Sequence, residues 1–169
     1  DCPPLPETIY VDRDMWEKIV LNLLSNAFKF TFQGQIALSL HAQTGGVELH
    51  VQDTGVGIPP EALPRLFERF YRVQDMRSRT YEGSGIGLAL VQELLQLHGG
   101  TVRVNSQVDQ GSTFVVTLPF GNAHLPPDKV VPHGRPTTPT TGVGPYLEEA
   151  LHWLPEPQHA TKPADGRPD

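Results

Sequence analysis

The distribution of proline divides the chain into two parts with different capacities to fold. Seven of the 17 prolines precede residue 122, and ten follow it. A segment rich in proline and threonine buries too little apolar surface to offset the entropy of ordering it. We therefore expect one folded domain in residues 1–121 and a mostly disordered linker in residues 122–169.

One stretch of the linker, residues 146–154, has a helical pattern. Pro145 stands where a first helical residue would be, and apolar residues recur at 147, 150, 151 and 154. The pattern is equally consistent with a short amphipathic helix that docks on another surface and with a transient helix inside a linker.

The first 121 residues alternate between helical and strand-like patterns. Apolar residues recur with a helical period over 14–30, 60–71 and 87–98, and they alternate with polar residues over 35–41, 47–52, 101–105 and 113–118. Asp12 or Asp14 would cap the first helix. This order predicts an α+β two-layer sandwich, with a mixed, mainly antiparallel sheet and helices packed on one face.

Composition and charge exclude several classes of function. A net charge of −6 argues against a nucleic-acid partner. The single cysteine, Cys2, excludes an intrachain disulfide and a cysteine-only metal site, and it suits a reducing compartment. No apolar run approaches the roughly 20 residues that cross a bilayer, and no signal-peptide pattern is present. We expect no membrane contact by this segment, a cytoplasmic location, and a parent protein that extends upstream of Asp1.

The first predicted helix carries an unusual polar stripe. Asn22, Asn26 and Lys29 fall at i, i+4 and i+7, on one face of an otherwise apolar helix. Asparagine is a poor helix former and is costly to bury unpaired. The stripe is either a partly exposed surface with satisfied amides or the wall of a cleft, where an amide oxygen would suit Mg²⁺ and the lysine a phosphate.

A glycine-rich loop opens the last predicted helix. Gly83, Gly85 and Gly87 would let backbone N–H groups approach an anion at the start of that helix. The spacing matches neither the dinucleotide fingerprint nor the P-loop. The loop is therefore a phosphate loop of another type or a structural hinge, and Arg77 and Arg79 just before it suit a lid over phosphates.

Two interpretations compete for Asp53-Thr54-Gly55-Val56-Gly57. Asp-Thr-Gly is the tripeptide of aspartic proteases, and Asp-x-Gly-x-Gly occurs in nucleotide pockets. The chain has one such copy and three predicted helices. A protease of this kind needs two copies or a homodimer in an all-β fold, so the nucleotide interpretation is favoured.

Four blocks stand in order along the domain: Asn22–Thr31, Asp53–Gly57, Phe67–Arg72 and Gly83–Leu88. Together they resemble the N, G1, F and G2 boxes of the catalytic, ATP-binding domain of bacterial sensor histidine kinases. That domain has the Bergerat-type fold shared with gyrase, Hsp90 and MutL. Residues 111–114, Gly-Ser-Thr-Phe, resemble the family's last box. The family's first strand precedes the long helix, and little of it remains here.

The resemblance implies ATP and Mg²⁺ as ligands and assigns roles to matching residues. Asn26 would hold Mg²⁺, with Asn22 assisting, and Lys29 would contact phosphate. Phe30 would stack near the adenine, and Asp53 would accept the adenine 6-amino group.

Further nucleotide contacts follow from the same boxes. Gly55 and Gly57 would let the base approach the backbone. Arg72, Arg77 and Arg79 would reach the terminal phosphate, with Arg72 joining Asn26 and Lys29 as a catalytic residue. The three glycines of the last loop would cradle the phosphates. The remaining contacts would come from Ile58, Ser84, Ile86, Leu88 and Thr113.

The resemblance also bears on the reaction. Gyrase-like relatives carry a glutamate at the position of Asn22, and an asparagine cannot accept a proton from water at neutral pH. This difference favours a kinase over an ATPase of that class, although such an ATPase, a serine kinase and a degenerate nucleotide-sensing or docking module stay open as alternatives.

None of the seven histidines is followed by an acidic residue, as the family's phosphoacceptor is. The acceptor would therefore belong to a separate dimerisation domain. It would pass the phosphoryl group to an aspartate of a response regulator receiver domain, and the linker is consistent with a receiver fused downstream.

Overall fold

The computed structural model describes residues 2–73 and 84–130. Two α-helices, α1 (Arg13–Phe30) and α2 (Gly87–Leu97), combine with four strands: β1 (Ile36–Gln43), β2 (Gly46–Asp53), β3 (Thr101–Gln107) and β4 (Gly111–Pro119). Short 3₁₀ turns occur at η1 (Leu63–Arg65) and η2 (Pro127–Lys129). The predicted helix at 146–154 and the residues Gly83, Arg77 and Arg79 lie outside the described residues.

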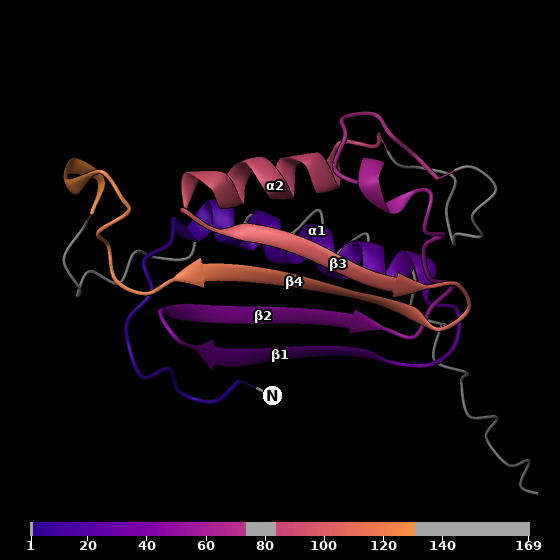
Figure 1. The fold of residues 1–169 in the computed structure, drawn as a ribbon, viewed down its shortest axis with the longest axis horizontal. Helices are drawn as coiled ribbons and strands as arrows, with labels where there is room; N and C mark the ends of the chain where they lie inside the picture. Colours follow the sequence, from indigo (N-terminus) through magenta and orange to yellow (C-terminus); the bar gives the residue numbers. More distant parts are fainter. Residues whose placement is uncertain (1, 74–83, 131–169) are drawn as a thin grey trace, which may run out of the picture.

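The strands form one sheet in the order β1-β2-β4-β3, and every neighbouring pair is antiparallel. Both helices cover the same face of this sheet (Figure 1). A single parallel bridge joins Ile9 to Gly121 beyond the end of β4. The predicted α+β two-layer architecture is confirmed. Neither helix among the described residues combines the length and apolarity needed to span a bilayer.

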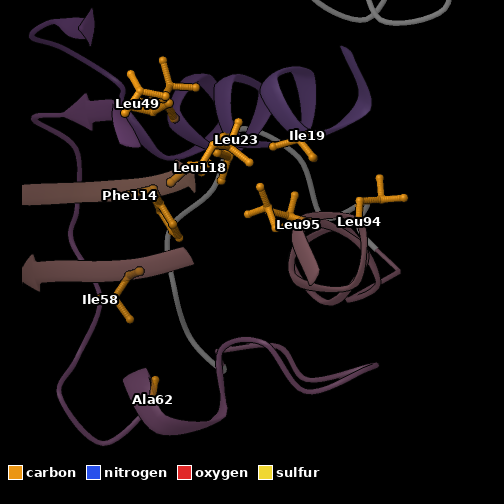
Figure 2. Packing of buried hydrophobic residues seen from close by; sticks show 14 residues of the cluster. Ile19, Leu23, Leu49, Ile58, Ala62, Leu94, Leu95, Phe114 and Leu118 are labelled. Atoms are coloured by element: carbon orange, nitrogen blue, oxygen red, sulfur yellow. The ribbon is translucent and has the colours of Figure 1, made fainter. Parts of the chain in front are cut away.

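The core lies between the helices and the sheet. Ile19, Leu23 and Ala27 recur along the buried face of α1. Alternate residues of β2 and β4 point at them, because side chains of a strand alternate between its faces. Figure 2 shows Leu94 and Leu95 of α2 meeting this cluster, with Ile58 at its edge.

A buried histidine joins the ends of the two helices. Asp12 is the N-cap of α1, and its Oδ1 accepts a hydrogen bond of 2.9 Å from Met15 N–H. The Asp12 backbone N–H in turn donates to His98 Nε2 at 2.9 Å, and His98 Nδ1 lies 2.7 Å from Leu94 O. His98 therefore accepts at Nε2 and donates at Nδ1, which fixes its neutral tautomer. This link joins the start of α1 to the end of α2.

The prediction of a helix over residues 60–71 is wrong. The segment contains η1 and a succession of turns in which several backbone N–H groups bond to the carbonyl three residues earlier, as Ala62 does to Pro59 and Glu68 to Arg65. Pro64 cannot donate an α-helical hydrogen bond, and its ring would crowd the carbonyl four residues before it. Phe70 has φ 65°, which ends any continuation.

Candidate functional site

Asp53 lies at the end of β2, on the face of the sheet that carries the helices. It pairs with Ser112 of β4, which pairs in turn with Ser106 of β3, so the three side chains form one row across the sheet. The Asp53 carboxyl group is buried, and Gly55 N–H donates to its Oδ1 at 2.8 Å. Burial raises the pKa of Asp53 above its usual 3.8, while hydrogen bonds from the backbone N–H groups of Gly55 and Ser112 partly offset that rise.

The loop after Asp53 is attached to the end of α1 and to the β3–β4 turn. Val56 N–H donates to Phe30 O at 3.1 Å, and Val56 O accepts from Asp109 N–H at 2.8 Å. Gly57 has φ 68°, and a Cβ there would collide with the carbonyl of Gln107. Any larger residue at Gly57 would push the loop away from the turn.

Ser106 also lies beside these residues, although no sequence pattern pointed to it. Its hydroxyl accepts the backbone N–H of Ile58 at 2.8 Å and lies 2.9 Å from both Gly111 O and Ser112 Oγ. A serine at the end of a strand is too common to indicate such a role. The pairing of Ser106 with Ser112 becomes visible only once the strand register is known.

Ser112, not Thr113, is the residue beside Asp53. Thr113 pairs with Gln52, so its side chain lies on the opposite face of the sheet. The resemblance to the last box points to this region, but the choice between adjacent residues depends on which face of β4 each one occupies. The structure does not bring Thr113 to the carboxylate.

One residue of the polar stripe of α1, Asn22, faces the start of α2. Asn22, Asn26 and Lys29 are each half-buried. Asn22 Nδ2 donates to Lys18 O at 2.8 Å, and a Cβ added at Gly87 would lie 2.6 Å from Asn22 Oδ1. The amide oxygen of Asn22 is therefore directed at the glycine that opens α2. Lys29 Nζ lies 5.6 Å from the ring centroid of Phe30.

The two glycine loops contact α1 at different heights. The Asp53 loop meets its last residue, Phe30, and Gly87 meets Asn22, eight residues earlier. At 1.5 Å per residue, the two contacts are about 12 Å apart along the helix axis. An elongated ligand could lie along the stripe with one end at Asp53 and the other at the start of α2.

The start of α2 has no side-chain cap. The N–H groups of a first helical turn have no partner within the helix, so they can bind an anion there. Ser84 Oγ accepts a long hydrogen bond of 3.4 Å from Ile86 N–H. Ser84 and Ile86 are exposed, and Leu88 packs against the core.

A backbone contact joins this loop to the preceding segment. Gly85 has φ 70°, and its carbonyl accepts the N–H of Phe70 at 2.9 Å. The structure therefore holds the last residues before the undescribed segment 74–83 close to the first residues after it. Arg72 is exposed in this region.

Within residues 2–73 and 84–130, no group of three His, Cys, Asp or Glu side chains could hold a metal ion. A metal bound here would need other oxygen ligands. The amide oxygens of Asn22 and Asn26 fit a hard cation such as Mg²⁺, which usually binds with few protein ligands and keeps waters or substrate phosphates.

Comparisons with known proteins agree on one family. Residues 11–122 match the family described as histidine kinase-, DNA gyrase B-, and HSP90-like ATPase. The chain is 37% identical over 129 residues to the sensor histidine kinase RcsC of Escherichia coli strain K12, covering 76% of this chain and 14% of RcsC. It is 44% identical over 123 residues to the sensor histidine kinase Hik2 of Thermosynechococcus vestitus, covering 71% of this chain and 32% of Hik2.

Solved structures give the same result. The mycobacterial sensor histidine kinase MprB superposes with a TM-score of 0.62 at 32% identity, over 71% of this chain and 82% of that one. Full-length ShkA in complex with AMPPNP superposes with a TM-score of 0.59 at 37% identity, over 68% of this chain and 23% of ShkA. The chain thus spans a third or less of the lengths of RcsC, Hik2 and ShkA.

Proposed function

The chain belongs to the family of histidine kinase-, DNA gyrase B-, and HSP90-like ATPases and is a catalytic domain of the sensor histidine kinase type, and from this premise we propose that it binds ATP with Mg²⁺ and transfers the γ-phosphoryl group to a histidine on a separate dimerisation domain. The observation that carries the proposal is the buried Asp53 carboxylate, which accepts from Gly55 N–H in a loop that bonds to the last residue of α1, Phe30.

Asp53 would recognise the adenine base. An ionised carboxylate only accepts hydrogen bonds, so it selects a base that presents an amino group. The exocyclic amino group of adenine is such a donor. Phe30 would line this end of the site, together with Gly55, Gly57 and Ile58. A guanine would present a carbonyl oxygen to the carboxylate and be rejected.

The phosphates would lie toward α2. Lys29, the N–H groups around Ser84, Gly85 and Gly87, and the N-terminus of α2 supply positive potential. Asn26 would hold Mg²⁺, with Asn22 assisting. When bound, the ion would neutralise the phosphate charge that develops during transfer.

Asn22 supports transfer to a protein side chain over hydrolysis. Its amide has no basic group to remove a proton from water, and Nδ2 already donates to Lys18 O. A neutral imidazole needs no such base, since its ring nitrogen can attack the γ-phosphorus directly. The bond from that phosphorus to the β,γ-bridging oxygen breaks, and ADP leaves. Arg72, Arg77 and Arg79 are the proposed contacts to the transferred group.

The exposed apolar residues Phe70 and Ile86 support docking of a partner domain beside the site. Phe70 is 72% exposed and Ile86 40% exposed, and Gly85 links the two through its bond to Phe70 N–H. We propose that the dimerisation domain covers them. The phosphohistidine would then pass its group to a receiver domain of a response regulator, fused downstream or separate, in the cytoplasm.

Calorimetry with a non-hydrolysable ATP analogue tests the nucleotide site. We expect binding that EDTA weakens, that Asn26→Ala weakens at least about tenfold, and that Asp53→Ala abolishes while the protein keeps a cooperative unfolding transition. Absence of binding by the wild type would instead indicate a degenerate sensing or docking module.

Phosphorylation of the parent protein, extended upstream, tests the transfer. Labelled ATP should give an acid-labile phosphoprotein, and the described domain alone should not label itself. Steady release of phosphate by the domain alone, lost in Asn26→Ala, would favour a gyrase-type ATPase over the kinase.

A further inference from the structure

The hydroxyl of Ser106 has all of its hydrogen-bonding capacity in use. A serine hydroxyl donates one hydrogen bond and accepts two. Ile58 N–H and Gly111 O permit only one role each, so Ser106 Oγ accepts from the former at 2.8 Å and donates to the latter at 2.9 Å. Its 2.9 Å contact with Ser112 Oγ then requires Ser112 to be the donor. Ser106 therefore joins three segments through one atom.

These partners lie at both ends of the loop that contains the proposed base-reading group. Ile58 ends the loop, and its side chain is anchored in the core (Figure 2). Ser112 is the cross-strand neighbour of Asp53, and its backbone N–H bonds to that carboxylate. Removal of the Ser106 hydroxyl would release both Ile58, at the far end of the loop, and Ser112, the neighbour of the Asp53 carboxylate.

Strand pairing does not depend on this hydroxyl. The β3–β4 ladder continues past Ser106 to the pair Gln107–Gly111. The sheet can therefore keep its backbone hydrogen bonds when the side chain is shortened. The loop loses the hydrogen bond that held it to Ser106.

We infer that Ser106 is a positioning residue that holds the Asp53 loop in the conformation that recognises an amino group on a purine. The inference rests on the proposed function, in which Asp53 accepts the adenine 6-amino group. Ser106 need not touch the nucleotide, because it acts through Ile58 and Ser112.

A comparison of two nucleotides separates positioning from a general effect on folding. ATP carries the 6-amino group, and purine riboside triphosphate lacks it but is otherwise the same. Calorimetry of the Mg²⁺ complexes gives the ratio of the two dissociation constants. We expect Ser106→Ala to weaken ATP binding about tenfold and purine riboside triphosphate binding less than about twofold.

Three further variants sharpen the test. Ser106→Thr keeps a hydroxyl and should restore the wild-type ratio. Ser39→Ala removes a hydroxyl from β1, on the opposite face of the sheet, and should leave the ratio unchanged. If Ser106→Ala does not fold, Ser106→Cys keeps the volume with a weakly bonding thiol and carries the same comparison.

The outcomes distinguish the inference from its premise. If Ser106→Ala weakens the binding of both nucleotides equally, or weakens neither, the ratio of the two dissociation constants is unchanged. Either result would overturn the positioning role while leaving the adenine contact of Asp53 intact. If the wild-type protein binds both nucleotides equally, the proposed contact between Asp53 and the adenine amino group is wrong, and the inference fails with it.

Discussion

In the proposed site, Asp53 would serve nucleotide binding at a cost to the stability of the fold. A buried carboxylate prefers to be neutral, which is why burial raises its pKa above 3.8. Two backbone N–H groups support the ionised form without removing the whole penalty. The folded protein therefore keeps a charged hydrogen-bond acceptor at a position where an apolar or neutral side chain would make the fold more stable.

Replacing Asp53 with asparagine should separate these two effects. Because the folded-state pKa is raised, ionised Asp53 opposes folding at neutral pH, and this cost disappears as the pH falls through the folded pKa to 3.8. Asp53→Asn should therefore raise the unfolding temperature by a few degrees at pH 7 and by much less near pH 3.5. Nucleotide binding should be lost, because the new amide NH₂ would face the adenine amino group.

Thermal unfolding followed by circular dichroism at the two pH values measures the effect. A lower unfolding temperature for Asp53→Asn at pH 7 would mean that the two N–H groups more than compensate for burial.

At the scale of the elements, the outer face of the sheet carries its own polar network. Glu48 of β2 bonds to His50 on the same strand at 3.0 Å and to Arg103 of β3 at 2.8 Å, so the Arg103 side chain spans the intervening strand β4. The His41 ring packs edge-on against His50, and Ser39 bonds to His41. Carboxylate and cation thus link three strands on the face opposite the helices.

This network predicts an acid-sensitive contribution to stability. The hydrogen bond from His50, assisted by Arg103, lowers the pKa of Glu48 below 4.5 despite partial burial. A lowered carboxyl pKa stabilises the fold above pH 4.5, and that contribution is lost as the pH falls through the folded pKa. Glu48→Gln should cost about 1 kcal/mol of unfolding free energy at pH 6, and the difference from wild type should shrink below pH 4.

Urea unfolding at pH 6 and pH 3.5 checks this expectation. Glu93→Gln is the matched control, because Glu93 pairs with Arg69 at an exposed site and should have little effect at either pH. A cost for Glu48→Gln that does not change with pH would assign its role to packing instead of charge.

At the scale of the whole molecule, the N-terminal arm closes the fold where β4 ends. Leu5 and Ile9 pack against the core, and Thr8 O accepts Gly121 N–H at 2.9 Å. The buried residues of the described core all lie before Pro119. The arm is thus part of the packed unit, whereas the sequence from residue 131 onward has the composition of a linker.

Truncation at the two ends should therefore have unequal effects on the unfolding temperature. Removal of residues 131–169 should change the unfolding temperature by less than about 2 °C and leave ATP affinity unchanged, since it takes nothing from the described core. Removal of residues 1–9 should lower the unfolding temperature by roughly 5–10 °C through lost apolar packing. Calorimetric unfolding of both shortened chains checks this, and a large loss from the C-terminal truncation would extend the domain beyond residue 130.

Local residue patterns predicted most of the helices and strands and the family to which the chain belongs. Helix α1 begins one residue after Asp12 because a capping oxygen is a local requirement, and the strands follow two-residue alternation set by neighbouring residues. The boxes around Asn22, Asp53 and Gly85 were recognisable since each is a short run of residues.

The contacts that local patterns did not predict join residues far apart in the chain. Ser106 meets Ile58 across 48 residues, and His98 meets Asp12 across 86. Ser112, and not Thr113, lies beside Asp53, because the pairing of β4 with β2 decides which face of the sheet each side chain occupies. Local spacing carries no information about which distant donor will reach an acceptor, since that is settled only when the helices and the sheet pack together.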